Sequence, residues 1–463
     1  MLELLEGALA HGDWLELRFH DRKSRSVLVE DGRLEGARSM RHAGVGVRTL
    51  VNGAWGFAST SVLTPEALAG AVAAARAAAL AASKRRATKP PRLPSMSWRN
   101  QTYRSPTRAP LDDKSLQEKI ELALTTEAKV KRGGKSITSS SVRYSELIDE
   151  KLIVTSDGAR VRIADTKPEL RVTAVAAMEG ELQTCTVAEG KTGGFGDLFA
   201  RKSADEMVEK AVKVATDLLR AGYVEGGKKR VILAPDVVGL LVHEAIGHTV
   251  EADFVLSGSA AAGKIGERVA SELVTLCDSG ASEYEAGAGG VVLVDDEGVP
   301  AQRVEIIKDG VLRSYLHNRE SAARFGVEPT GNARAFEFDN EPLIRMRNTY
   351  IEPGSTPLSR MVADTADGLL LVGAKNGQAD ANAEFMFVVG EVYPIKHGML
   401  GPLHRGTTIT GNAFDVLKSV DMVGDQFAWE LGSGYCGKGQ PAKVDAGGPH
   451  VRCTVTLAGK EPT

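Results

Sequence analysis

Residues 231–248 read VILAPDVVGLLVHEAIGH, a short apolar strand followed by an apolar helix that ends in two histidines. Pro235 and Asp236 are typical of a first helical turn, where a proline loses no hydrogen bond and a carboxylate meets the positive end of the helix dipole. The valines and leucines that follow predict a buried helix. We therefore expect His243 and His248 on a rigid support, at the point where the helix leaves the core.

The histidines belong to the hexapeptide His243-Glu244-Ala245-Ile246-Gly247-His248, or HExxxH, which is one residue longer than the HExxH of zinc peptidases. On a regular helix, residues four apart lie about 40° apart around the axis, whereas residues five apart lie about 140° apart. An undistorted helix could not direct both imidazoles at one ion. The spacing thus predicts a metal site on a helix that bulges or unwinds, with Gly247 at the position where non-helical geometry costs least.

A catalytic zinc needs a third protein ligand and an open position for water. Cys436 is the best candidate, because it lies in the glycine-rich segment 432–439, although a free cysteine is more often a small buried apolar residue. Glu251 and Asp253 follow His248 closely. Each is a fourth ligand, a partner that orients an imidazole, or a solvated surface carboxylate.

The rest of the chain predicts an α+β fold, with an α/β N-terminal domain followed by a β-rich C-terminal domain that carries the metal helix. Residues 14–60 show strand patterns joined by the turn dipeptides Asp31-Gly32 and Asn52-Gly53. Helices are expected over 65–83, from residue 116, and over 204–221. Glycine-rich short strands dominate after residue 229.

We divide the chain into four segments. Residues 1–83 form the first part of the N-terminal domain, 84–114 a basic linker, 115–222 the continuation of the N-terminal domain, and 223–463 the C-terminal domain. The linker has nine Lys or Arg against two Asp and is rich in proline, which favours an exposed connection over a nucleic-acid patch.

Composition excludes several classes of protein. The chain has 463 residues, 43% of them hydrophobic, and a net charge of −3, so it is neither disordered nor charged enough to attract nucleic acid or anionic lipid. The four cysteines form no CxxC pair, the N-terminus has no signal-peptide pattern, and the alanine-rich stretch 67–82 falls short of a membrane span. We predict a cytoplasmic protein with free thiols, no membrane association and no nucleic-acid partner.

Motifs along nearly the whole chain are similar to those of the TldD/PmbA family of modulator-of-gyrase-type metallopeptidases. Besides HExxxH with Glu251 and Asp253, they are Leu15–Arg18, Gly44–Arg48, Gly53–Ala58, Pro329–Asn332, Arg347–Tyr350, Gly377–Asp380, Val423–Asp425 and Tyr435–Gln440. TldD-type chains of this family carry HExxxH and the late cysteine, whereas PmbA-type chains lack the metal motif. This sequence resembles the catalytic, TldD-like kind.

The resemblance implies zinc held by His243, His248 and Cys436, with Glu244 as catalytic base. It implies unfolded or leader-bearing peptides as substrates, bound extended along a sheet edge. It also implies a dimer, either of this chain or with a PmbA-like subunit.

Three functions follow as hypotheses. The first is a zinc peptidase of the HExxxH type, with water activated by zinc and Glu244 and no other cofactor. The alternative is a non-catalytic peptide-binding subunit of a two-chain complex, with a structural or vestigial metal site. A third, direct binding to DNA or gyrase, is weakened by the net charge of −3.

Overall fold

The computed structural model describes residues 1–9, 13–84, 93 and 101–458. The N-terminal half contains, in chain order, α1 (Leu2–Ala8), β1 (Trp14–Glu30), β2 (Arg33–Val51), β3 (Ala54–Thr60), α2 (Pro65–Ser83), β4 (Gln101–Arg104), η1 (Leu111–Asp113), α3 (Leu116–Arg132), β5 (Ile137–Thr155), β6 (Arg160–Met178), β7 (Glu181–Gly190), α4 (Phe195–Leu198) and α5 (Ala204–Leu218).

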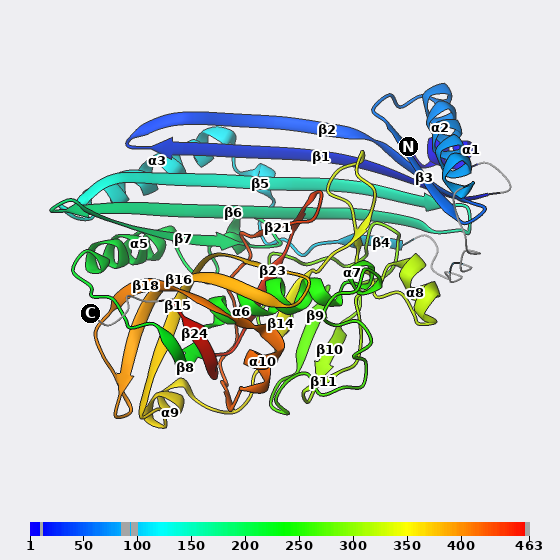
Figure 1. The fold of residues 1–463 in the computed structure, drawn as a ribbon. Coiled ribbons are helices and arrows are strands. Elements are labelled where there is room, and N and C mark those ends of the chain that lie inside the picture. The colour runs from blue at the N-terminus through cyan, green and yellow to red at the C-terminus, as the bar shows by residue number, and fades with distance from the viewer. Residues whose placement is uncertain (10–12, 85–92, 94–100, 459–463) are drawn as a thin grey trace.

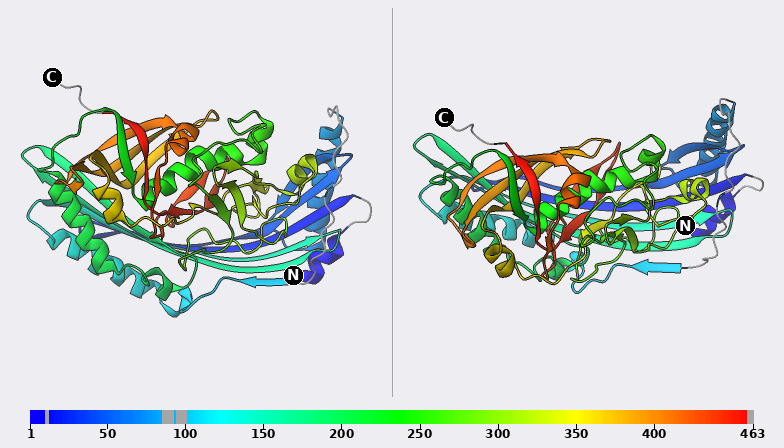
Figure 2. Two further views of the ribbon diagram at one scale, coloured as in Figure 1. Left: turned by 90° about the horizontal axis from the view of Figure 1, so that it is seen from below. Right: turned by 60° about the horizontal axis from the view of Figure 1, so that its bottom comes forward.

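The strands of this half form one sheet in the order β3-β2-β1-β5-β6, and β4 and β7 both pair with β6. Only the pairing of β4 with β6 is parallel. Four of the strands, β1, β2, β5 and β6, run side by side along the length of the molecule (Figure 1). Figure 2 shows that the sheet is curved and that the C-terminal half lies against its concave face.

Both faces of the sheet are covered over part of their area, although the first half of β2 is largely exposed, and the side chains of β1 show what covers each face. Leu15, Leu17 and Val27 are buried against the helices, in clusters with α1, α2, α3 and α5. Residues of the other parity, such as Arg18 and Arg22, are also buried but contact the C-terminal half, where Arg18 donates to the carbonyl of Asn340. Successive side chains of a strand point to opposite faces, so one strand holds an apolar layer and a charged layer.

Helix α2 packs on β3 through small residues. A Cβ on Gly56 of β3 would lie 1.9 Å from the carbonyl oxygen of Ala75, so helix and strand approach as closely as a glycine permits. By length and composition α2 is the one helix of the described residues that could span a membrane. One such helix is by itself weak evidence for a membrane-spanning segment. The prediction that residues 67–82 are not apolar enough to span a membrane is therefore not confirmed, because α2 meets the length and composition of a spanning helix.

The C-terminal half contains β8 (Gly227–Leu233), α6 (Pro235–Leu241), η2 (Val242–Gly247), η3 (His248–Val250), α7 (Ala252–Leu256), β9 (Leu276–Ser279), β10 (Val304–Lys308), β11 (Val311–Leu312), α8 (Arg319–Phe325), β12 (Ala333–Arg334), β13 (Leu343–Ile344), β14 (Asn348–Ile351), α9 (Leu358–Ala363), β15 (Asp367–Ala379), β16 (Glu384–Lys396), β17 (Met399–Leu400), β18 (His404–Asn412), α10 (Ala413–Lys418), β19 (Met422–Val423), β20 (Ala428–Trp429), β21 (Tyr435–Gly437), β22 (Pro441–Lys443), β23 (Asp445–Gly448) and β24 (Val451–Leu457).

Two sheets organise this half. Strands β15, β8, β24, β18 and β16 follow one another, and β15 also pairs with β16, which closes a small barrel. The second sheet has the order β11-β10-β9-β14-β23-β20. Helix α6 and η2 contact β15 of the barrel and β14 of the second sheet, so the predicted metal helix is held between the two sheets.

The α+β fold predicted from the sequence is confirmed. The turns Asp31-Gly32 and Asn52-Gly53 have positive φ at all four residues and join β1 to β2 and β2 to β3, as their dipeptides predict. The third predicted helix ends at Leu218, three residues earlier than expected. Of the predicted linker, residues 85–92 and 94–100 lie outside the described residues, and β4 of the same segment is a strand of the large sheet. The proposed domain boundaries remain a prediction.

Candidate metal centre

The helix that carries the histidines widens where the HExxxH spacing predicts. Regular α-helix ends at Leu241, residues 242–247 form a π-helical turn, and a 3₁₀ turn follows from His248. In a π-helix the hydrogen bonds join residues five apart, so these residues lie above one another. The predicted bulge is confirmed, and it brings His243 and His248 to one side, with ring centroids 5.4 Å apart.

Gly247 has a different role from the one expected. Its backbone is right-handed helical, with φ −54° and ψ −47°, so no unusual conformation requires a glycine there. A Cβ at this position would lie 1.8 Å from Sδ of Met346. Gly247 is therefore needed because a methionine of the neighbouring segment packs directly against the π-helical turn.

Cys436 joins the two histidines although it is 188 residues away in the sequence. One nitrogen of each imidazole and the Cys436 Sγ all lie within 4.8 Å of one another, and Sγ is 3.2 Å from Nε2 of His248. Both ring nitrogens of His243 are buried and have no hydrogen-bond partner among the described residues. Buried nitrogens without a partner are costly, and two imidazoles with a thiolate are a donor set typical of zinc. The side chains thus fit the expected ion.

The electrostatics favour a thiolate. Burial opposes charge on Cys436, but the adjacent imidazoles of His243 and His248 outweigh it and lower the pKa of the thiol to about 4. Burial also disfavours charge on His248, yet its hydrogen bonds to Cys436 and Glu251 raise its pKa to about 10. A metal ligand must be deprotonated, so the low thiol pKa prepares Cys436 for binding.

Glu251 contacts the ligand candidate His248, and Asp253 is linked to Glu251 through Lys438. The Oε2 of Glu251 lies 3.1 Å from Nδ1 of His248, which leaves Nε2 facing Cys436. Lys438 Nζ donates to the same Glu251 oxygen at 2.9 Å and to Asp253 at 2.8 Å. The contact of Oε2 with His248 agrees with orientation of the imidazole, while Oε1 is buried without a hydrogen-bond partner among the described residues, so the role of Glu251 stays a prediction.

Three residues that the sequence analysis did not single out support this arrangement. Lys438 ties the segment after Cys436 to Glu251. Arg345 is fully buried and donates to the carbonyls of Cys436 in β21 and of Gln440 just before β22, so it binds the β21–β22 hairpin at one strand and at its turn. The third is Met346, which packs on Gly247. No spacing rule connects these positions to the hexapeptide, although Lys438 lies only two residues after the cysteine.

Glu244 faces a pocket beside the ligands. The pocket has a volume of about 310 Å³, and its wall includes Glu244, His248, Lys438 and residues 377–381 at the end of β15. The Oε2 of Glu244 lies 3.7 Å from Nε2 of His248. The carboxylate is thus next to the potential ion and also open to the pocket.

The wall formed by β15 is an unpaired strand edge. Strand β8 pairs with β15 only at residues 369–371, and within the described part of the chain no strand pairs with residues 373–379 on that side. Asp236 accepts the N–H groups of Gly373 and Ala374, both at 2.8 Å, at the start of this edge. Residues 375–378 of this edge are exposed, and Gly377 and Gln378 line the pocket.

The other cysteines do not take part. Cys185, Cys277 and Cys453 are buried and unpaired, and burial raises the pKa of Cys185 to about 11 and that of Cys277 to about 12. They behave as the small apolar residues expected of most free cysteines.

Family models and relatives of known type match most of the chain. Models described as PmbA/TldA metallopeptidase domain 1, central domain and C-terminal domain match residues 15–79, 109–219 and 226–459. The chain is 34% identical to a metalloprotease of Methanocaldococcus jannaschii over 460 residues, 99% of both chains. It is 33% identical to a zinc metalloprotease TldD homolog of Saccharolobus solfataricus over 341 residues, covering 73% of this chain and 75% of that one.

Among solved structures, TldE from Thermococcus kodakarensis superposes with a TM-score of 0.79. At 18% identity, over 99% of this chain and all of the other, that likeness shows the fold alone. The sequence matches carry the assignment further, because they extend over the whole chain and over all three family models. The chain belongs to the PmbA/TldD metallopeptidase family.

Proposed function

We propose that this protein is a zinc-dependent peptidase in which Glu244 activates water. The observation that carries the proposal is the gathering of His243, His248 and Cys436 ligand atoms within 4.8 Å, beside a pocket that Glu244 lines. A purely structural zinc site would need a fourth protein ligand and no adjacent glutamate. Among the described residues the cluster offers three ligands, which favours an open position for water.

His243, His248 and Cys436 would hold the ion through two ring nitrogens and a thiolate. When bound, zinc would supply Lewis acidity, lowering the pKa of a water ligand towards neutrality and polarising a peptide carbonyl. Glu244 accepts the proton of the attacking water and passes it to the leaving amine. Glu251 keeps the His248 ring in the orientation that directs Nε2 at the site.

We propose extended peptides as the substrate class, either unfolded segments or leader-bearing precursors. An extended peptide can pair with the free edge of β15 through backbone hydrogen bonds alone, which makes binding tolerant of sequence. The pocket wall at Gly377 to Ala379 lies on this edge, so a paired peptide would pass Glu244. In a folded protein most backbone groups are already paired, so fewer segments can bind in this way.

The proposal includes a cytoplasmic location and assembly as a dimer, with a second copy or with a PmbA-like subunit. The likeness to TldE is consistent with a relationship between two chain types of one fold.

Substitution of Glu244 tests the mechanism. Glu244→Ala should keep the metal, because Glu244 is not among the three ligands, and should lower the rate of cleavage of an unfolded peptide by roughly 10²–10⁴-fold, the usual contribution of a general base. The measurement is peptide cleavage by mass spectrometry together with zinc content.

A matched control is Glu267→Ala, which removes an exposed glutamate of the same half that pairs only with Lys264 in the described part of the chain. This variant should cleave at the wild-type rate. Cleavage by Glu244→Ala at that same rate would refute the assignment. Full zinc occupancy in the wild type without hydrolysis of any unfolded peptide would favour the non-catalytic binding subunit instead.

A further inference from the structure

A second pocket, whose charged lining side chains are mostly buried, lies between the concave face of the large sheet and the C-terminal half. It has a volume of about 60 Å³. Its charged and aromatic lining side chains include Arg22, Lys151 and Lys167 from the sheet and Arg334, Phe336 and Lys443 from the C-terminal half. None of its lining residues is shared with the pocket at Glu244. We call this space the basic cavity.

Cations outnumber carboxylates in the basic cavity. The lining contains five Lys or Arg and three carboxylates, namely Arg22, Lys151, Lys167, Arg334, Lys443, Asp149, Asp165 and Asp296. The excess is therefore two positive charges, and it falls to one if Glu169, which pairs with Lys443 at 2.5 Å, is added. A net positive charge in a buried space is costly unless an anion enters.

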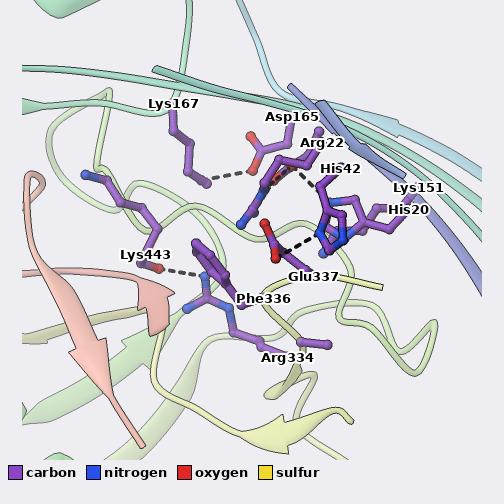
Figure 3. Close-up of polar contacts among 12 residues, drawn as sticks. His20, Arg22, His42, Lys151, Asp165, Lys167, Arg334, Phe336, Glu337 and Lys443 are labelled. Carbon is purple, nitrogen blue, oxygen red and sulfur yellow. Dashed lines mark hydrogen bonds and ion pairs between the residues drawn. The ribbon is translucent and has the colours of Figure 1, made fainter. Parts of the chain in front are cut away.

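Arg22 has a free donor in this space. Its Nε and Nη2 form two bonds of 2.7 Å to Asp149, but its Nη1 is buried and has no hydrogen-bond partner among the described residues. Its guanidinium lies 4.0 Å from the ring centre of Phe336. Figure 3 shows the guanidinium directed toward the space between Lys167 and Phe336. The side chain is 7% exposed, so bulk water does not satisfy the free donor.

Arg334 enters from the opposite wall. Its Nη1 and Nη2 donate only to the backbone, to the carbonyls of Met346 and Lys443 at 2.7 and 2.6 Å. Within the described part of the chain no carboxylate lies within 4 Å of its guanidinium. Burial, and after it the neighbouring Arg345, lower its pKa to about 10 against the opposing effect of Asp296 and Asp278. Arg334 is thus a buried cation that makes no direct ion pair with a carboxylate of the described residues.

We propose that the basic cavity binds one small oxyanion of the phosphate or sulfate class, held between the guanidinium groups of Arg22 and Arg334. The volume would admit roughly four waters, which is about the space a tetrahedral oxyanion takes. Guanidinium groups present donors in the geometry that such oxygens accept. The anion would join the sheet to the C-terminal half at a place where direct ion pairs are incomplete. This site is separate from the metal centre and does not depend on peptidase activity.

Titration calorimetry with inorganic phosphate tests the proposal on the full chain, with sodium chloride at matched ionic strength as reference. One phosphate per chain should bind saturably, and binding should persist after zinc is removed with a chelator. Arg22→Lys removes Nη1 but keeps the charge, and we expect roughly tenfold weaker binding or more, the usual loss for a charged hydrogen bond. Arg334→Gln should abolish binding.

Arg25→Lys is the matched control, because Arg25 lies on the same strand but pairs with Glu146 and Asp112 outside the cavity. It should bind phosphate as the wild type does. If Arg334→Gln does not fold, Arg22→Lys still decides the question, since it preserves the charge. The proposal would be overturned by the absence of saturable binding, by equal affinity in wild type and Arg22→Lys, or by binding that disappears with the metal.

Discussion

At the candidate metal centre neither ring nitrogen of His243 has a hydrogen-bond partner among the described residues, whereas in the ion network between the two halves each buried carboxylate faces a guanidinium. The ion network consists of Glu16, Arg48, Glu297, Arg319 and Asp157. Arg48 Nη2 reaches Glu16 at 3.1 Å and Glu297 at 2.5 Å, and the backbone N–H of Arg319 donates to Glu297 at 2.8 Å. In the ion network the described residues supply guanidinium partners for the buried carboxylates, although Nε of Arg48 has no partner among them, whereas at the candidate metal centre neither ring nitrogen of His243 has one.

This difference distinguishes the ion network, which is a structural cluster, from the site at His243, which is suited to a ligand. Burying a charge is tolerated when an opposite charge accompanies it, and the ion network meets this condition with residues from both halves of the chain. Buried imidazole nitrogens without a hydrogen-bond partner among the described residues require another explanation, and at His243 a bound metal ion would provide it. The comparison predicts that substitutions in the ion network lower the free energy of unfolding, and that substitutions in the candidate metal centre lower the metal content.

Arg48→Met breaks the ion network and should have the largest effect on stability. It leaves Glu16 and Glu297 buried without the guanidinium between them, which should reduce the free energy of unfolding by about 3–5 kcal/mol. Urea unfolding measures the change, and the folded fraction should keep its zinc. Arg41→Met is the control, since Arg41 pairs with Asp21 on the exposed side of the same sheet and should cost about 1 kcal/mol or less. Equal losses for the two variants would contradict the account.

Gly247→Ala disturbs the candidate metal centre instead of the ion network, and we expect its main effect on zinc binding. The new Cβ meets Met346 Sδ, and such overpacking should cost about 1–3 kcal/mol while displacing the ligands on either side of the π-helical turn. We expect weaker zinc binding, measured by competition with a chelator. The double variant Gly247→Ala with Met346→Ala should recover zinc affinity because the obstacle is gone. Gly70→Ala, at a helical position with open space, should not change zinc binding.

A smaller, pH-dependent effect is expected at Glu16. Burial, outweighing Arg48, raises its pKa from 4.5 to about 7. The folded state therefore keeps this proton while the unfolded state loses it, so stability falls as pH rises from 4.5 to 7 and is level above that. Glu16→Gln carries no such proton, and its stability relative to the wild type should increase across this window. A difference that does not vary with pH would show that Glu16 is already ionised in the folded protein.

Part of this structure could be predicted from the sequence because its signals are local. The turn dipeptides at 31–32 and 52–53 specify hairpins through residues that tolerate positive φ, and the spacing of His243 and His248 requires a widened helix. The length of β1 could not be predicted, because its middle is charged, and charged strand residues are buried only when partners exist. The partner of Arg22 is Asp149, 127 residues away.

The same limit applies to the site. Cys436 lies in a glycine-rich segment, which makes it a candidate, but the β21–β22 hairpin that carries it is bound by Arg345, 91 residues earlier in the sequence. The role of Gly247 was misjudged because the residue that excludes a side chain there, Met346, comes from a segment about a hundred residues later. Packing partners distant in the sequence leave no local pattern.

The most direct measurement is the zinc content of the purified chain, by elemental analysis, in the wild type and in Cys436→Ser. The account predicts about one zinc per chain in the wild type and its loss in the variant, because two imidazoles alone make a weak site. Cys185→Ser, at a buried cysteine outside the cluster, should retain the zinc. A wild-type chain without zinc, or a Cys436→Ser variant that holds as much as the wild type, would contradict the three-ligand centre.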